Sequence, residues 1–463
     1  MIRLLRHLIP STVLTLLITE VVLILGCFIA ASFLVLDVDP VVYLLYDGGL
    51  GRLSIVLCTI LLALYFHDLY SEIRVRQTIL LVQQTLQAIG IAFLAQALVS
   101  YIDPALILPR WLMVLGSGFS LVAVVSWRIF YSTVVLRALG EARVVFLGDS
   151  GLVFEIAHSL HEHPELGMRA VGYIADQPRQ ELLADGLELL GRPAELRGII
   201  ERTRADRIIV GMPERRGRMP MLDLLGLRFS GVRIEEASTA FENIFKRVAL
   251  EELRPCQLVF SGELGPRPGN VVLQSAYSSL IALLGVIVGA PVMLVVAVAI
   301  KVSSPGPVLL RQTRVGWQGA LFTLYKFRSM YVDAETGTGA VWAAKDDPRV
   351  TPIGRWLRRL RLDEIPQFFN VLRGEMSIVG PRPERPEFVE TLAHRIPFYR
   401  QRLCVKPGIT GWAQINHKYG DSMEDAARKI EYDLYYIKNL SPAMDAFIIF
   451  HTFKTMLLSR GAQ

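Results

Sequence analysis

Five long apolar stretches constrain the fold of this chain more than any other feature of its 463 residues. Four lie in the first 140 residues, at about 11–36, 50–67, 78–100 and 111–136, and the fifth lies at 276–302. Each is close to the ~20 residues that a helix needs to cross the hydrocarbon core of a bilayer. The mean hydropathy of +0.40 agrees with a chain that lies partly in a membrane. We therefore expect residues 1–140 to form a transmembrane α-helical bundle with four spans.

The charges that flank the first four stretches predict the orientation of this bundle. Arginines precede the first stretch, separate the second from the third, and follow the fourth: Arg3, Arg6, Arg74, Arg76, Arg137 and Arg143. Aspartates mark the other two loops, the second of which also carries Arg110: Asp37, Asp39, Asp47 and Asp103. Because cytoplasmic loops carry the excess of Lys and Arg, both ends of the bundle are predicted to be cytoplasmic.

Residues 141–265 have the pattern of a soluble α/β domain. Short apolar runs at 142–148, 170–174, 206–211 and 232–234 predict strands, and residues 152–161 predict a helix. Strands that alternate with helices favour a parallel, Rossmann-like sheet. The turn that starts at Gly148 lacks a full G-x-G-x-x-G, since Phe154 stands at the third glycine position. We expect a degenerate nucleotide motif here, with a structural or regulatory role and no nucleotide cofactor.

The fifth apolar stretch, at 276–302, allows two topologies. It is long enough to cross the membrane once, which would put the two soluble parts of the chain on opposite sides. Pro291 lies inside it, and proline removes a backbone donor and clashes with the preceding turn. A helix that enters the membrane, breaks at Pro291 and returns would keep both ends in the cytoplasm. We predict this re-entrant form, because both soluble parts then lie on one side.

Asp363 and Glu364 are adjacent carboxylates in a stretch that is unusually rich in arginine. The arginines lie on both sides of the pair: Arg355, Arg358, Arg359, Arg361, Arg373 and Arg382. Guanidinium groups bind phosphoryl oxygens, while a carboxylate can hold a divalent cation or attack phosphorus. A solvated helix with salt bridges would show the same charges. The net charge of +6 is too modest to favour a nucleic-acid partner, whereas anionic lipids and phosphorylated substrates fit these clusters.

Seven short motifs surround this pair in a fixed order. They are Ser304-Pro305-Gly306-Pro307-Val308, Arg311-Gln312-Thr313-Arg314-Val315-Gly316, Lys326-Phe327-Arg328-Ser329-Met330, Thr351-Pro352-Ile353-Gly354, Leu362-Asp363-Glu364-Ile365-Pro366-Gln367, Val379-Gly380-Pro381-Arg382-Pro383 and Lys406-Pro407-Gly408-Ile409-Thr410-Gly411. Residues 270–463 thereby resemble the catalytic domain of the bacterial polyprenyl-phosphate sugar-1-phosphate transferases. These are the monotopic phosphoglycosyl transferases that begin exopolysaccharide and O-antigen assembly. The bundle and the α/β domain resemble the long-form members of that family.

This resemblance implies a reaction. A nucleoside diphosphate sugar, with UDP as the expected carrier, gives its sugar-1-phosphate to undecaprenyl phosphate and releases UMP. Asp363 matches the nucleophile that forms a covalent phosphosugar intermediate, and Glu364 matches its partner. The resemblance also implies Mg²⁺ as cofactor with Asp363 as its contact, and a homodimer in the bacterial inner membrane whose mostly helical catalytic domain faces the cytoplasm.

Five further cations are candidates for phosphate binding. Arg382 lies between two prolines, which fix its backbone, so we expect it on the substrate phosphates, with a structural salt bridge as the alternative. Lys326 and Arg328 match the family's segment and are expected at the donor diphosphate. Arg311 and Arg314 closely follow the membrane segment, where they fit either the acceptor phosphate or a lipid headgroup anchor.

Two other functions compete with the transferase. One is a membrane-tethered enzyme that modifies nucleotide sugars in residues 141–265, although that segment has no Tyr-x-x-x-Lys pair near a complete glycine fingerprint. The other is a non-catalytic scaffold for polysaccharide assembly. The intact Asp363-Glu364 pair favours catalysis over a scaffold.

Overall fold

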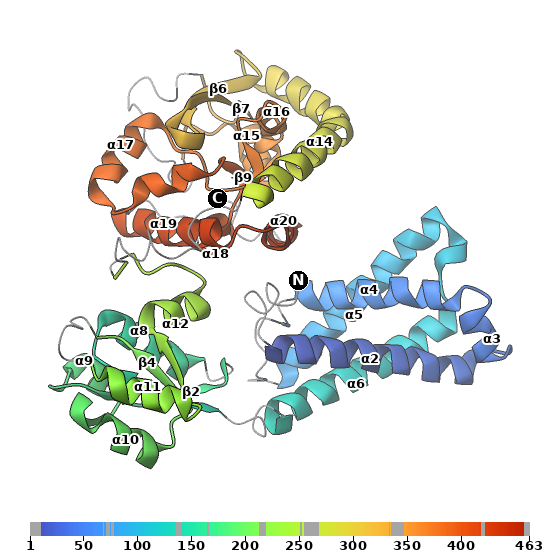
Figure 1. The fold of residues 1–463 in the computed structure, drawn as a ribbon. Helices are drawn as coiled ribbons and strands as arrows, with labels where there is room; N and C mark the ends of the chain where they lie inside the picture. The colour runs from blue at the N-terminus through green and yellow to red at the C-terminus, as the bar shows by residue number, and fades with distance from the viewer. Residues whose placement is uncertain are drawn as a thin grey trace. The chain divides into compact units, whose positions relative to one another are not determined.

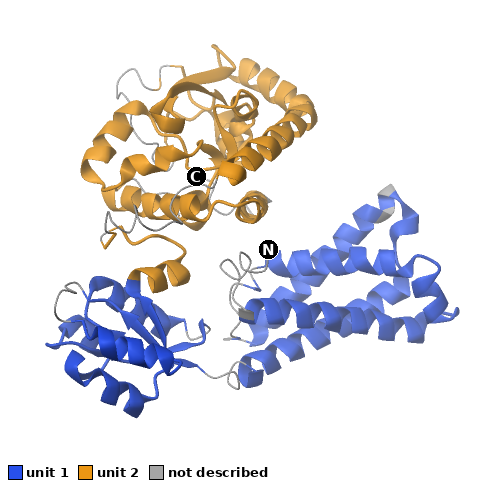
Figure 2. Cartoon of the chain, viewed as in Figure 1, with its two compact units in different colours: residues 1–237 blue, residues 238–463 orange. Residues whose placement is uncertain are grey.

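The computed structural model divides the chain into two compact units, residues 1–237 and 238–463, which Figure 2 shows in blue and orange. It describes residues 11–67, 69–70, 75, 78–135, 141–163, 166–212, 219–250, 252–253, 268–332, 334, 347–417 and 422–457. Of the arginines used to orient the bundle, all but Arg110 and Arg143 lie outside these residues. The predicted division of the chain at 140, 265 and 270 stays a prediction, and each unit is described below by itself.

The first four apolar stretches are confirmed as helices (Figure 1). These helices are α2 (Ser11–Val35), α4 (Gly49–Phe66), α5 (Thr78–Ile102) and α6 (Arg110–Phe130), with the short α3 (Pro40–Leu45) after α2 and a π-helical turn at Tyr131–Val135. They and α14 of unit 2 are the helices, among those described, that are long and apolar enough to cross a membrane. The chain is therefore a membrane protein.

A buried ion pair holds the first and last of these four helices together. The Glu20 carboxylate on α2 lies 2.6 Å from the Arg128 guanidinium on α6, and both side chains are almost fully buried. The Tyr70 hydroxyl donates to the same carboxylate at 2.5 Å, and Arg128 also donates to the Leu69 carbonyl. A charge pair in an apolar interior persists only when its groups are mutually satisfied, so this network specifies how α2 meets α6.

The second part of unit 1 is a parallel sheet in the order β3-β2-β1-β4-β5, the Rossmann-like arrangement expected. Its strands and helices are β1 (Ala142–Leu147), α8 (Gly151–Glu162), β2 (Met168–Ile174), α9 (Gln180–Ala184), β3 (Leu189–Gly191), α10 (Leu196–Thr203), β4 (Arg207–Val210), α11 (Met221–Phe229) and β5 (Arg233–Glu236). The short edge strand β3 was not predicted, because its three residues carry too little pattern.

The turn after β1 is occupied by the chain's own groups. Gly148 has a φ of +108°, a left-handed conformation that favours glycine. The Arg179 side chain donates to the carbonyl of Asp149, and the Ser150 amide donates to the Gly211 carbonyl at 3.1 Å. Space for α8 beside the sheet comes from Gly211, where an added Cβ would collide with Val153. The glycine that directly follows β4 thus replaces the missing third glycine of the motif in packing this helix.

Unit 2 is mostly helical and contains two small sheets. Its helices, turns and strands are α12 (Ala237–Phe245, which starts at the last residue of unit 1), α14 (Pro268–Ser303), β6 (Leu309–Val315), β7 (Leu321–Phe327), α15 (Pro352–Arg359), η6 (Leu362–Glu364), α16 (Gln367–Leu372), β8 (Ser377–Val379), α17 (Pro386–Arg395), η7 (Tyr399–Cys404), β9 (Gly408–Thr410), α18 (Trp412–Asn416), α19 (Met423–Lys438) and α20 (Pro442–Leu457). Strands β6 and β7 form an antiparallel hairpin, and β8 pairs with β9 in parallel.

Helix α14 is longer than predicted and continues through Pro291. Figure 1 draws it in yellow-green as two arms that run in different directions. At its start, Asn270 donates to the Leu440 carbonyl at 2.8 Å and Gln274 donates to Asp445 at 2.7 Å. At its end, Ile300 packs in one cluster with Phe327 and Leu357. Both ends of α14 therefore contact the same compact unit.

Asn370 fastens α16 to the edge of β7. Its side-chain oxygen accepts from the Tyr325 amide at 3.1 Å, and its nitrogen donates to the Thr323 carbonyl and to Glu375, each at 2.7 Å. The side chain is completely buried. It supplies the bonds that a further strand would make to β7. The turn before α16 is thereby held beside the hairpin.

Replacing Asn370 by alanine tests this attachment. The Tyr325 amide and the Thr323 carbonyl would lose a buried partner, so we expect Asn370→Ala to lower the free energy of unfolding by about 3 kcal/mol. Thermal unfolding in detergent measures the loss. Asn439→Ala is the control, since Asn439 directly follows α19 and donates to the Tyr435 carbonyl of that helix, and it should cost less than about 1 kcal/mol. Equal losses in the two variants would contradict this role for Asn370.

Candidate active site

Asp363 and Glu364 lie in a tight turn between two helices. Helix α15 ends at Arg359, Arg361 adopts a left-handed φ of 52°, and the turn η6 leads within three residues to the start of α16. Both carboxylate residues are buried, at 8% and 9% exposure. Two adjacent buried carboxylates are costly unless cations or a ligand compensate them, so their partners indicate what each does.

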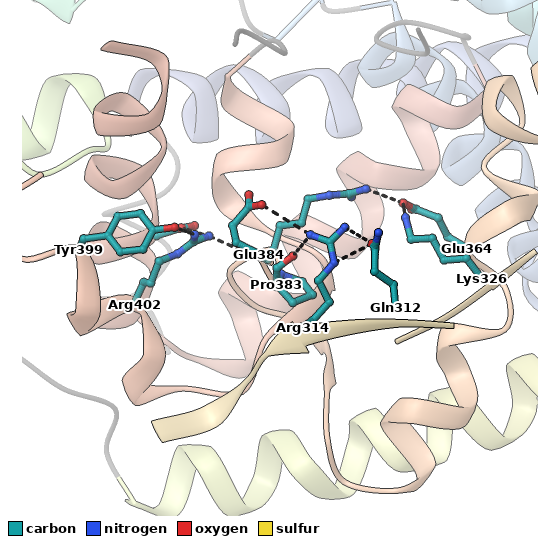
Figure 3. A network of polar contacts seen from close by, with 10 residues as sticks. Gln312, Arg314, Lys326, Glu364, Pro383, Glu384, Tyr399 and Arg402 are labelled. Atoms are coloured by element: carbon teal, nitrogen blue, oxygen red, sulfur yellow. Dashed lines mark hydrogen bonds and ion pairs between the residues drawn. The ribbon is translucent and has the colours of Figure 1, made fainter. Parts of the chain in front are cut away.

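Glu364 is held by cations from two other parts of the unit. Its Oε1 atom accepts from Lys326 Nζ on β7 at 3.0 Å and from Arg382 Nη2 at 2.9 Å (Figure 3). Arg361 approaches Oε2 at 3.9 Å. Burial alone would raise the pKa of Glu364, but the charges of Lys326, Arg382 and Arg361 hold it well below its usual range. Glu364 therefore stays ionised and joins the hairpin to the loop of Arg382.

The Asp363 carboxylate differs from that of Glu364 in its hydrogen bonds and ion pairs. Among the described residues, none donates a hydrogen bond to its carboxylate or forms an ion pair with it. Burial and the neighbouring charge of Glu364 raise the pKa of Asp363, against the opposing effect of Lys326, Arg358 and Arg382. A carboxylate that is surrounded by cations but bonded to none is available to a substrate or a metal. The two neighbours thus divide into a fixed residue and an available one.

Arg382 projects from a segment in which a proline stands on each side of it. Pro381 and Pro383 flank it and are buried, whereas the Arg382 side chain keeps 29% of its surface exposed. One of its terminal nitrogens bonds Glu364. Because a guanidinium group carries five donors, Arg382 can bond Glu364 and still present donors to an anion.

The other three predicted cations do not bond the acidic pair. Arg328 is buried and donates to the Ser304 and Pro305 carbonyls, at 2.8 and 2.7 Å, where α14 ends. Arg314 donates to the Pro383 carbonyl at 3.0 Å, and Arg311 is exposed on β6 opposite Tyr325. These contacts show a structural use for Arg328 and Arg314, and phosphate binding by the three stays a prediction.

The described residues contain no group of three or more His, Cys, Asp or Glu side chains that could hold a metal. A single available carboxylate nonetheless fits Mg²⁺, which commonly takes one or two protein oxygens and completes its shell with water and substrate phosphates. Asp363 has such an oxygen, and Mg²⁺ binding stays a prediction.

Sequence patterns did not reveal several residues that hold this site in place. Asn370 fixes α16, Arg402 donates to the Arg382 carbonyl at 2.9 Å, and Gln274 bonds Asp445 in the interior. Each contact joins residues that are 20 or more apart in the chain. No local spacing could have predicted them. The signal that existed was a lone polar residue in an apolar setting, as at Asn370.

Two family models match the chain. Residues 269–459 match the bacterial sugar transferase family, and residues 65–225 match a family described as a CoA-binding domain. The first match covers nearly all of α14 and the whole acidic site.

Several curated proteins are similar to parts of the chain. A UDP-N-acetylgalactosamine-undecaprenyl-phosphate N-acetylgalactosaminephosphotransferase of Aeromonas hydrophila is 45% identical, over 48% of this chain and 52% of its own length. A UDP-glucose:undecaprenyl-phosphate glucose-1-phosphate transferase of Xanthomonas campestris pv. campestris is 37% identical, over 66% of this chain and 65% of its own length. The chain thus spans about half to two thirds of these relatives.

A shorter relative is matched almost throughout. The exopolysaccharide production protein PSS of Rhizobium leguminosarum bv. phaseoli is 43% identical, over 40% of this chain and 94% of its own length. Together with the family match over residues 269–459, which includes the acidic pair and its cations, this similarity shows that the chain belongs to the bacterial sugar transferase family.

Proposed function

We propose that this protein transfers a sugar-1-phosphate from a UDP-sugar to undecaprenyl phosphate, releases UMP, and so begins the assembly of an exopolysaccharide or O-antigen. The contrast between the fixed Glu364 and the available Asp363 is the observation that carries the chemistry. The names of the Aeromonas and Xanthomonas relatives, which specify UDP-sugars and undecaprenyl phosphate, support the substrates. These relatives differ in their sugar, so the sugar is left open.

The transfer proceeds in two displacements at phosphorus. First, a carboxylate oxygen of Asp363 attacks the phosphorus that bears the sugar; a P–O bond forms, the bond to the UMP oxygen breaks, and UMP leaves with that electron pair. Next, a phosphate oxygen of undecaprenyl phosphate attacks the same phosphorus and returns the Asp363 carboxylate. This order lets a soluble donor and a lipid acceptor use one site in turn.

The cations of the site stabilise the charge that these displacements develop. Arg382 and Lys326 are held by Glu364 beside Asp363, where they can bind the phosphoryl oxygens. Asp363 would hold Mg²⁺, which would supply further masking of the phosphate charge.

The proposed topology has four spans and one re-entrant helix in the bacterial inner membrane, with unit 2 facing the cytoplasm. A straight helix of 36 residues would be about 54 Å long, well beyond the ~30 Å core of a bilayer. Yet both ends of α14 contact residues of one compact unit. A bend at Pro291 reconciles these facts, because one arm then enters the membrane and the other arm returns to the same side.

The homodimer implied by the resemblance is also a proposal. Light scattering in detergent tests it.

Replacing the proposed nucleophile, Asp363, tests the proposed transfer reaction. The purified protein, with Mg²⁺, undecaprenyl phosphate and a panel of UDP-sugars, should release UMP from at least one donor. We expect Asp363→Asn to reduce this release by about 10³-fold or more, because the amide cannot attack phosphorus. Asp223→Asn, at an exposed position of α11, is the matched control and should keep full activity.

Omitting the lipid separates the two-step course from direct transfer. Through a covalent intermediate, the wild-type protein should release about one equivalent of UMP per site without undecaprenyl phosphate, and a hexose phosphate should appear on the peptide that contains Asp363. UMP that appears only when lipid is present would contradict the aspartyl intermediate. A chain that releases no UMP from any donor would instead favour the scaffold alternative.

Labelling tests the re-entrant helix. Single cysteines replace Gly269 and Ser303, which are exposed near the two ends of α14, in a background without the four native cysteines. An impermeant maleimide should label both positions in inside-out vesicles and neither in right-side-out spheroplasts. A single crossing predicts one label from each side. Val288→Cys, near the middle of α14, is expected to resist the reagent from both sides, because lipid covers it.

A further inference from the structure

The segment that presents Arg382 is held almost entirely through its carbonyl groups. Pro381 and Pro383 have no amide hydrogen, so backbone hydrogen bonds can hold these two positions only where their carbonyls accept. Donors from elsewhere in unit 2 meet these acceptors. The Pro381 carbonyl accepts from the Gly408 amide at 3.0 Å, and the Glu384 carbonyl accepts from the Val315 amide at 3.0 Å.

Two arginines supply the remaining donors. The Arg382 carbonyl accepts from Arg402 Nη2 at 2.9 Å, and the Pro383 carbonyl accepts from Arg314 Nη1 at 3.0 Å. Figure 3 shows Arg314 and Arg402 reaching this segment from β6 and from η7. Four consecutive carbonyls, from residue 381 to residue 384, are thus bonded. The backbone is fixed at the residue whose side chain reaches Glu364.

The Arg402 side chain is buried and has two further partners. It is 7% exposed, and its guanidinium forms an ion pair with Asp433 of α19 at 2.8 Å and donates to the Tyr399 hydroxyl at 3.0 Å. Asp433 and Tyr399 are each 2% exposed. The ion pair and the Tyr399 bond fix the plane of the guanidinium, so the nitrogen that reaches the Arg382 carbonyl has a fixed direction.

We propose that Arg402 is a positioning residue for the transferase reaction: it holds the main chain of Arg382, so that the Arg382 side chain reaches both Glu364 and the phosphates of the donor. Arg402 acts through Arg382 and does not bind substrate. This proposal rests on the function proposed above. Lysine cannot replace Arg402 in this role, because one ammonium group lacks the planar fork that serves Asp433, Tyr399 and the carbonyl together.

A double-mutant cycle tests the proposal. In the wild-type background we expect Arg402→Lys to lower kcat/KM for the UDP-sugar by about 10- to 100-fold, since small displacements of a phosphate-binding group cost that much. In the Arg382→Ala background the same change should cost less than about threefold, because the group that Arg402 positions is gone. Binding of UDP, measured by calorimetry, should show the same pattern. Arg400→Lys, on the exposed face of η7, is the matched control.

Equal losses in the two backgrounds would overturn the proposal, since Arg402 would then act independently of Arg382. If Arg402→Lys does not fold, the pair Arg402→Gln with Asp433→Asn replaces it, because this pair leaves no buried charge without a partner. The same cycle then applies. A loss of activity that only follows a lower melting temperature, equally in both backgrounds, would also count against positioning.

Amide exchange separates this proposal from the proposed function. Exchange at residues 379–385 should be faster in Arg402→Lys than in the wild type or Arg400→Lys, with no substrate present. A wild-type protein that releases UMP from no donor would remove the proposed function, while faster exchange would still support Arg402 as the holder of this segment. Unchanged exchange would overturn the positioning role whatever the activity.

Discussion

One carboxylate oxygen, Glu364 Oε1, joins the parts of the site. It accepts from Lys326 on the β6–β7 hairpin and from Arg382 on the proline-flanked segment, so two elements that are far apart in the sequence meet at one atom. The low dielectric of the buried site strengthens these charge-assisted bonds, and they keep Glu364 ionised. Asp363 has no such partner among the residues that the structure describes, and under the proposed function it is available to the substrate. Adjacent residues of the same type therefore have different roles because their surroundings differ.

The scaffold around this oxygen consists of short elements held by single buried polar residues. Asn370 attaches α16 to β7, and Arg402 attaches η7 to the main chain of Arg382. The two-stranded sheets and short helices of unit 2 offer little regular hydrogen bonding beyond their own ladders. Hydrogen bonds from side chains to backbone groups therefore hold these elements together in place of further strand or helix hydrogen bonds. Such bonds fix position accurately, since each joins a rigid planar group to a defined carbonyl or amide.

Helix α14 packs against the residues that follow the acidic pair. Gly285 and Gly289 lie near its middle, where Cβ atoms would stand 2.8 Å from Phe368 and 3.7 Å from Ile365. These two apolar residues closely follow the acidic pair in the chain. The absence of a side chain at Gly285 lets Phe368 approach the helix closely. The acidic turn is thus placed against the helix that enters the membrane, within reach of a lipid-borne phosphate under the proposed topology.

The sequence by itself determined the apolar helices, the main strands of the parallel sheet, the family, and the pairing of an acidic dyad with arginines. Hydrophobic period, span length and ordered motifs are local properties that the chain carries without its fold. Tertiary structure decided which cation meets which group: Lys326 and Arg382 reach Glu364, while Arg328 and Arg314 bond carbonyls. An arginine carries the same charge in either role, and only the distances set by folding tell a cation that bonds the acidic pair from one that bonds backbone carbonyls.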